Sequence, residues 1–245
     1  MSKNKSKITK WEYVTEPFDV LVLPELVKRV HSPLTPWLSS LTENCYVHLR
    51  PCVQGLDEDG AVVKYLYCTR YGRFFVRGKD GWNEILPHGR SENFKKKGSG
   101  YNDAPQLKNF GNKLAHRCVA FAWLDVPKDV KLQMIGVDAP TKWEVDHLNT
   151  DHKNWTADNL QWVTPDENRR RGKIARQLRK AAIDPKILTP TLCRGIYTLP
   201  EERIGELIER FKMCCVADDG ELSVENIRIN VAMALDSIRS TIKNN

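Results

Sequence analysis

A sharply defined helix start near the middle of the 245-residue chain constrains the fold most strongly. Thr164 is a predicted N-cap, because Pro165 follows at the first helical position and Glu167 completes a capping box. Asp166 adds a negative charge at the positive end of the helix dipole. A helix is therefore expected to begin at Pro165, and the elements predicted before it have to end at Thr164.

The residues before this helix predict a short strand. Trp143, Val145 and His147 alternate with Glu144 and Asp146, which is the period of a half-buried strand. The carboxylate of Asp146 and the imidazole of His147 are therefore expected to point to opposite faces. They cannot play the same role.

A polar loop and a second strand complete the pattern. Residues 148–158 have loop composition, and residues 159–163 predict a short strand, so a hairpin with a long tip is expected. Asn168 falls in the first turn of the helix that follows. If this helix folds back on the hairpin, the amide oxygen of Asn168 can share an ion with Asp146.

Asp146, His147 and Asn168 together predict phosphodiester hydrolysis. Carboxylate and amide oxygens are hard ligands that suit one Mg²⁺ ion, or Mn²⁺ in its place, and leave positions open for phosphate oxygens. An imidazole that is close to neutral at physiological pH can take a proton from an attacking water. The cation would neutralise the phosphate and stabilise the leaving oxygen. We therefore expect a one-metal nuclease site.

The same stretch resembles the HNH family, in particular the phage and intron homing endonucleases. The resemblance is most specific in Val145-Asp146-His147-Leu148, in residues 159–164 and in Glu167-Asn168. Looser similarity precedes it, in Tyr71-Gly72-Arg73, Gly100-Tyr101 and Ala115 to Trp123. The match covers roughly residues 66–170. Within it, His116 precedes an apolar helical run and is interpreted as a packing residue rather than a catalyst.

The resemblance implies a ββα-metal fold and cleavage of double-stranded DNA. By position it implies that His147 is the general base and that Asp146 and Asn168 are the metal ligands. It also implies that Asn159 braces the hairpin and orients the base. One departure is Thr150, which stands in the tip where the family usually has glycine. His152 follows closely and is a second candidate for proton transfer.

The helix after Asn168 predicts a basic face. At 3.6 residues per turn, Ile174, Leu178 and Ala181 line one side. The opposite side gathers Arg169, Lys173, Arg176 and Lys180, with Arg179 at its flank. A second basic run, Lys95-Lys96-Lys97, lies in a polar stretch that predicts a loop. Both are candidates for phosphate contacts, which give affinity but little sequence selectivity, and a merely solvated charged surface is the alternative.

Charge and composition favour a nucleic-acid partner. The net charge is +7 with a pI near 9.0, and residues from Leu199 onward hold nine acidic and six basic side chains, so the first 198 residues carry +10. No apolar run approaches the length of a membrane span, and no signal-peptide core follows the Lys-rich start. We expect a cytoplasmic protein with no membrane association. Seven cysteines without a Cys-x-x-Cys pair argue for reduced thiols.

The expected fold class is α+β, with an HNH ββα core, upstream β-strands and a C-terminal helical hairpin. Residues 1–60 are a region of unknown role that includes a predicted helix from Pro24 to His31. Residues 61–183 are the expected nuclease domain, with two or three strands before Leu86; residues 184–198 are a linker and residues 199–245 a helical module. That hairpin either presents Asn226, Arg228 and Asn230 to a DNA groove or packs on the chain or on a second copy.

Three classes of function remain open at this point. The first is a homing-type endonuclease with one active site per chain, which would nick one strand and would need a dimer or successive cuts to break both. The second is a DNA-binding regulator built on an inactive HNH scaffold. The third, a structural protein of a phage or mobile element, fits the sequence less well.

Overall fold

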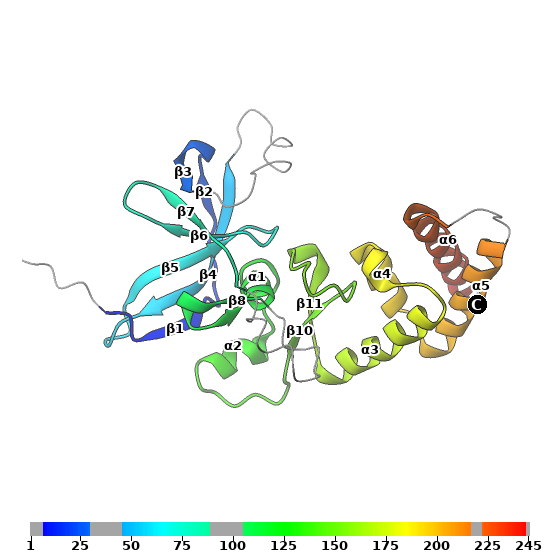
Figure 1. Cartoon of the computed structure of the whole chain (residues 1–245). Helices are drawn as coiled ribbons and strands as arrows, with labels where there is room; N and C mark the ends of the chain where they lie inside the picture. The colour runs from blue at the N-terminus through cyan, green and yellow to red at the C-terminus, as the bar shows by residue number, and fades with distance from the viewer. Residues whose placement is uncertain (1–6, 30–45, 89–104, 217–221, 244–245) are drawn as a thin grey trace, which may run out of the picture. The chain divides into compact units, whose positions relative to one another are not determined.

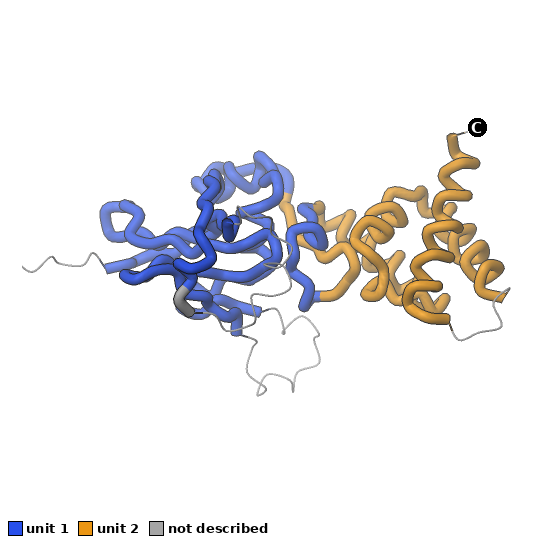
Figure 2. The backbone as a smooth tube through the Cα atoms, turned by 90° about the horizontal axis from the view of Figure 1, so that it is seen from above, with its two compact units in different colours: residues 1–141, 152–162 blue, residues 142–151, 163–245 orange. Residues whose placement is uncertain are grey.

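The computed structural model describes residues 7–29, 46–88, 105–216 and 222–243 (Figure 1). The chain is divided into two compact units (Figure 2). Unit 1 comprises residues 1–141 and 152–162, and unit 2 comprises residues 142–151 and 163–245. Sheets and helices are both present, as predicted for an α+β chain. The division runs through the segment 61–183 that the sequence assigns to the nuclease domain.

Seven strands form the main sheet of unit 1, in the order β1-β4-β5-β6-β7-β3, and β2 also pairs with β4. Their bounds are β1 Lys10–Tyr13, β2 Val20–Val22, β3 Val27–Arg29, β4 Val47–Leu56, β5 Val62–Cys68, β6 Phe74–Arg77 and β7 Trp82–Ile85. Neighbouring strands are antiparallel except β3 and β7, which run parallel. Strands β5 to β7 confirm the prediction of strands before Leu86.

The N-terminal residues belong to this sheet rather than to a separate region. The predicted helix from Pro24 to His31 is wrong in its described part, because η1 (Pro24–Leu26) is a single 3₁₀ turn and β3 follows it at once. Val27 of β3 pairs with Trp82 of β7. Pairing with a distant strand therefore overrides the local helix preference. Residues 30 and 31 lie outside the described residues.

One helix packs on this sheet and closes the core of unit 1. Helix α1 (Ala115–Trp123) lies against β4 and β5 (Figure 1). Phe121 is buried, stacks on Tyr13 with ring centroids 4.3 Å apart, and meets Trp162 edge to face at 5.2 Å. Burial of each such ring contributes about 2 kcal/mol. The smaller elements of unit 1 are β8 Gln106–Leu107, η3 Lys108–Phe110, β9 Lys113–Leu114, α2 Lys128–Met134 and η4 Ala157–Asn159.

Unit 2 is mainly helical. Its elements are β10 Glu144–His147, α3 Pro165–Lys180, η5 Pro185–Ile187, α4 Pro190–Tyr197, α5 Glu201–Val216 and α6 Val224–Lys243. A single core joins them, with Ile174, Ile196, Leu207 and Leu235 all buried in it. The C-terminal hairpin of α5 and α6 therefore packs on the preceding helices, which is one of the alternatives that the sequence left open.

The order strand, loop, strand, helix predicted around the candidate site is present. Strand β11 (Leu160–Val163) forms a two-stranded sheet with β10, and α3 begins two residues after β11 ends. The structure therefore contains the succession of elements that the HNH resemblance implies. Membership of that family remains a proposal.

Residues 184–198 differ from the predicted linker. Thr189 caps α4 by accepting a hydrogen bond at Oγ1 from the Leu192 amide at 3.3 Å, and Pro190 takes the first helical position. Cys193 and Ile196 of this helix are buried in the core of unit 2. The Thr-Pro pair therefore marks a helix start, because a proline at that position costs no hydrogen bond.

Two of the three residues considered for DNA reading on α6 are engaged within unit 2. Arg228 Nε donates to the carbonyl of Ile187 at 2.6 Å, and the Asn230 amide lies 3.9 Å from the sulfur of Cys215. Both side chains help to hold α6 in place, which weakens the groove-reading alternative. Of the helices in the described ranges, none combines the length and apolar character needed to cross a bilayer.

Candidate metal and nucleic-acid site

The helix start predicted at Thr164 is confirmed and it positions Asn168. Thr164 Oγ1 accepts a hydrogen bond from the amide of Glu167 at 3.3 Å, and Pro165 opens α3. The amide of Asn168 donates to the Thr164 carbonyl at 2.9 Å. Because both bonds are local, they place the backbone of Asn168 in the first turn of α3.

Asn168 contacts Glu144 of β10. Its Nδ2 donates to Glu144 Oε2 at 2.6 Å. Glu144 and Asp146 are two residues apart on the strand and therefore share one of its faces. The first turn of α3 thus lies against the face of β10 that carries both carboxylates, including Asp146, with which the sequence predicted that Asn168 would share an ion.

The nearest charged partner of Asp146 is Arg171, which the sequence analysis missed. Arg171 Nη1 lies 3.7 Å from Asp146 Oδ2, and its Nε donates to Glu167 Oε1 at 2.8 Å. The guanidinium also lies 5.1 Å from the ring centroid of Tyr197, and the side chain is only 9% exposed. Two signals in the sequence indicate this role: the helical spacing of Arg171 with Ile174 on the buried face, and its i,i+4 relation to Glu167.

Burial governs the protonation of Asp146. It raises the pKa of Asp146 to about 6, and the neighbouring Arg171 guanidinium offsets only part of that rise. A backbone hydrogen bond and the proximity of Glu144 have smaller effects, in opposite directions. The carboxylate is therefore ionised at neutral pH, at a cost in folding free energy that a bound cation would reduce.

The stability of the fold is expected to depend on pH through Asp146. Its folded pKa of about 6 exceeds the ordinary value of 3.8, so its contribution is complete below pH 4 and is lost as the pH rises to 6 and beyond. The shift corresponds to about 3 kcal/mol. Urea unfolding of the wild type and of Asp146→Asn at pH 4 and pH 7 measures it. The difference between the two proteins should change by about 2 kcal/mol between these two pH values, because the unfolded carboxyl is already partly ionised at pH 4, and an unchanged difference would show an ordinary pKa.

His147 and Asn159 are both buried. The side chain of His147 is 4% exposed and, by strand alternation, lies on the face of β10 opposite Asp146. Asn159 is fully buried, and its Nδ2 donates to the Asn154 carbonyl at 2.8 Å. Asn159 thus braces the loop before β11. The role in orienting His147 that the resemblance gives it stays a prediction.

Thr150 occupies a backbone conformation that explains why glycine is expected there. Its φ is 59°, in the left-handed region that side chains branched at Cβ rarely adopt. The Thr150 amide donates to the His147 carbonyl at 2.9 Å, and the Asn149 side chain accepts from the Asp151 amide at 3.0 Å. Arg179 Nη2 adds a bond to Thr150 Oγ1 at 2.6 Å. These contacts close the same tight turn without glycine.

The burial of His116 is consistent with its interpretation as a packing residue. Burial, the charge of Arg117 and the proximity of His152 together lower the pKa of His116 to about 4. The ring is therefore neutral at physiological pH. His152 is exposed, so it remains open to a role in proton transfer.

The basic face of α3 is exposed as predicted. All five of its basic residues are exposed, whereas Ile174, Ala175 and Leu178 are buried on the other side. Three of them have protein partners: Arg169 pairs with Asp166, Lys173 with Glu201, and Arg179 with Thr150 and Asp184. Arg176 and Lys180 have no ion-pair partner within the described ranges. Lys95, Lys96 and Lys97 lie outside the described residues.

The side chains around Asn168 include oxygen atoms of the kind that bind a hydrated divalent cation. Asp146 provides a carboxylate oxygen on this strand face, and the Asn168 amide can add its oxygen because its nitrogen is engaged by Glu144. Three carboxylates, those of Glu144, Asp146 and Glu167, outnumber the guanidinium groups of Arg170 and Arg171 beside them. No group of three or more His, Cys, Asp or Glu side chains able to hold a metal is found in the described part of the chain. A cation here would therefore keep several waters or take phosphate oxygens.

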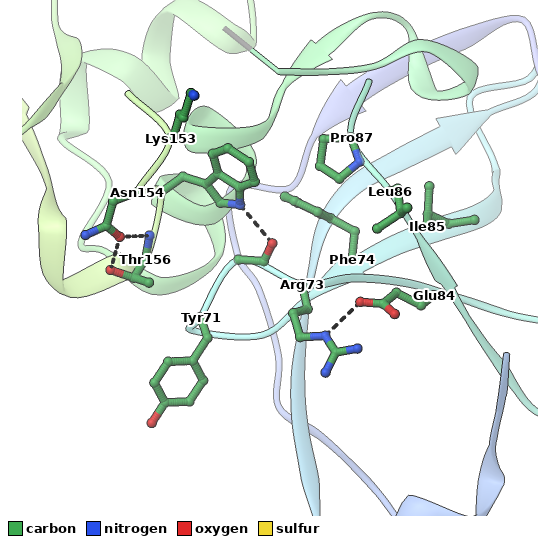
Figure 3. Close-up of a pocket in the computed structure, with 12 residues that line it drawn as sticks. Tyr71, Arg73, Phe74, Glu84, Ile85, Leu86, Pro87, Lys153, Asn154 and Thr156 are labelled. Carbon is green, nitrogen blue, oxygen red and sulfur yellow. Dashed lines mark hydrogen bonds and ion pairs between the residues drawn. The ribbon is translucent and has the colours of Figure 1, made fainter. Parts of the chain in front are cut away.

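A separate recess of about 260 Å³ lies in unit 1 (Figure 3). Its walls are residues 71–74, 84–87 and 153–156. The indole of Trp155 donates from Nε1 to the Gly72 carbonyl at 2.9 Å, and Arg73 pairs with Glu84 at 2.7 Å. None of the residues predicted to act in catalysis, metal binding or DNA binding lines this recess.

Comparison of the chain with family models, with curated proteins and with solved structures found no match.

Proposed function

We propose that the protein is a metal-dependent DNA endonuclease of the HNH type. One observation carries the proposal: α3 brings Asn168 onto the face of β10 that holds Glu144 and Asp146, while His147 lies on the opposite face of the same strand. Hard oxygen ligands and an imidazole thus come from one strand and one helix turn. That separation of metal ligands and base follows from the period of the strand.

The chemistry follows from what each group can do. A ring nitrogen of His147 accepts the proton of the attacking water, which is the task of a general base near neutral pH. Asp146 and Asn168 hold the cation, with Mg²⁺ the preferred ion and Mn²⁺ a substitute. When bound, that ion neutralises the scissile phosphate and stabilises the leaving oxygen. Because His147 is buried, DNA binding has to open access to its ring.

A nicking assay tests the proposal. Supercoiled plasmid is incubated with the protein and Mg²⁺, and in parallel with EDTA in place of the ion. Conversion to open circles with Mg²⁺ alone supports the endonuclease. Absence of nicking with Mg²⁺ and with Mn²⁺, at protein concentrations that shift the DNA in a gel, overturns it.

A second candidate function is a DNA-binding regulator on an inactive scaffold. The observation that favours it is that both predicted metal ligands already have protein partners: Arg171 lies beside Asp146, and Glu144 accepts from Asn168. A guanidinium can replace a cation as the counter-charge of a buried carboxylate. The regulator predicts DNA binding that is the same with Mg²⁺ and with EDTA, with no cleavage in either.

Arg176 and Lys180 are the basic residues of α3 expected to contact phosphates. Changing both to glutamine should weaken duplex binding by roughly one to two orders of magnitude at 0.1 M salt, and should reduce the slope of log affinity against log salt by about 2. Fluorescence anisotropy with a labelled duplex at several salt concentrations measures both. The matched control, which also removes two charges, changes Lys212 and Lys243, exposed lysines of α5 and α6, to glutamine. Equal effects of the two changes would mean that α3 only adds net charge.

A further inference from the structure

Glu144 lies beside the predicted metal ligands, although no role was predicted for it from the sequence. Its Oε2 accepts the hydrogen bond from Asn168 Nδ2 at 2.6 Å. The amide of Asn168 has a donating and an accepting end, whereas an ionised carboxylate only accepts. This contact therefore decides how the amide is turned: its nitrogen faces Glu144, and its oxygen faces away.

The position of Glu144 on β10 relates this orientation of the Asn168 amide to the proposed metal site. Glu144 and Asp146 share one face of the strand, and α3 meets that face at two points. Asn168 meets Glu144, and one helical turn later Arg171 lies 3.7 Å from Asp146. Arg171 is held in turn by Glu167 at 2.8 Å. These two contacts hold α3 against β10. They leave the amide oxygen as the side-chain atom of Asn168 that can still bind a cation.

We propose that Glu144 is a positioning residue that turns Asn168 so that its Oδ1, and not its amide nitrogen, is presented to a divalent cation. The inference rests on the proposed function, since it assigns Asn168 to the metal. Without Glu144 the amide rotates, and half of its orientations present a donor that repels a cation. Groups that orient metal ligands in this way typically change metal affinity by roughly 10- to 100-fold.

Binding of Mn²⁺, measured by electron paramagnetic resonance without DNA, tests the inference. Glu144→Ala removes the hydrogen bond and should weaken Mn²⁺ binding by roughly 10-fold or more. Glu144→Gln removes the charge but keeps an acceptor, so it should recover most of the affinity. Asp166→Ala is the matched control, because this carboxylate lies in the same helix turn, is 88% exposed and pairs with Arg169 rather than with Asn168. It should bind Mn²⁺ nearly as the wild type does.

Nicking kinetics give a second readout. The Mn²⁺ concentration at half-maximal rate should rise for Glu144→Ala, while the rate at saturating Mn²⁺ stays within a few-fold of the wild type. Equal affinity of Glu144→Ala and Asp166→Ala overturns the inference, and so does a Glu144→Gln variant as weak as Glu144→Ala. If wild type and Asp146→Ala bind Mn²⁺ equally poorly, the metal site itself fails, and the inference and the proposed function fall together.

Discussion

Replacing His147 by alanine is expected to lower the rate of Mg²⁺-dependent plasmid nicking by roughly 10²- to 10⁴-fold, which is the usual contribution of a general base. The effect is expected at His147 because it is the only imidazole on the strand that carries Asp146. Its ring lies on the face opposite the proposed metal ligands, so it is left to accept a proton rather than to bind the ion. Binding of the variant to a labelled duplex should remain within a few-fold of the wild type, because the phosphate contacts proposed for α3 do not involve it. Single-turnover nicking at saturating protein measures the rate without a contribution from binding.

His152→Ala is the matched control for this experiment. His152 is exposed and lies in the loop after β10, where it is the second candidate for proton transfer. It should nick at the wild-type rate. If His152→Ala loses the activity and His147→Ala keeps it, the base has been assigned to the wrong residue. Circular dichroism shows whether removal of the buried His147 ring has disturbed the fold, and His147→Gln repeats the test with a side chain of similar volume.

Replacing Gly72 by alanine is expected to destabilise unit 1 by about 3 to 4 kcal/mol. Gly72 has a φ of +77°, which L-residues with a side chain rarely adopt. A Cβ there would also overlap Cδ1 of Trp155 and lie 2.5 Å from its Nε1. The indole would have to leave the position from which it donates to the Gly72 carbonyl at 2.9 Å. Urea denaturation followed by tryptophan fluorescence measures the loss.

Gly60→Ala separates the two causes of that loss. Gly60 has nearly the same φ, +78°, but no atom lies within 4 Å of the position its Cβ would take. It should cost only about 1 kcal/mol, the backbone strain alone. In a Trp155→Ala background, Gly72→Ala should cost little more than Gly60→Ala, because only the backbone carbonyl of residue 155, at 3.3 Å, remains close to the Cβ position. A Gly72→Ala variant as stable as Gly60→Ala in the wild-type background would show that the indole moves aside freely.

Local sequence patterns were sufficient to predict the helix and strand around the candidate site. The Thr164 side-chain cap and a proline place the start of α3, and alternation separates Asp146 from His147 on β10. Helical spacing also gave the buried face of α3 and its exposed basic face. These features follow from hydrogen bonds and side-chain directions within a few residues, so they can be predicted without knowing what the segment packs against.

The partners of the site residues could not be predicted in the same way. Asn168 contacts Glu144 and Asp146 lies next to Arg171, whereas the sequence indicated only that Asn168 and Asp146 could share an ion. These partners depend on how far along β10 the helix α3 lies, which local sequence patterns do not specify. Arg171 was missed because a charged residue is expected at the surface, whereas here Glu167 and Tyr197 stabilise its burial.

The amino-acid sequence by itself determined where α3 begins, which faces of β10 and α3 carry polar groups, and which residue types are available for a metal and a base. Tertiary structure decided that residues 27–29 form a strand, that residues 190–197 form a buried helix, and that Arg171 stands next to Asp146. The physical reason is the distance along the chain over which each interaction acts. Capping and periodicity act within one or two turns, while strand pairing, burial and the resulting pKa of Asp146 depend on groups that only the folded chain brings together.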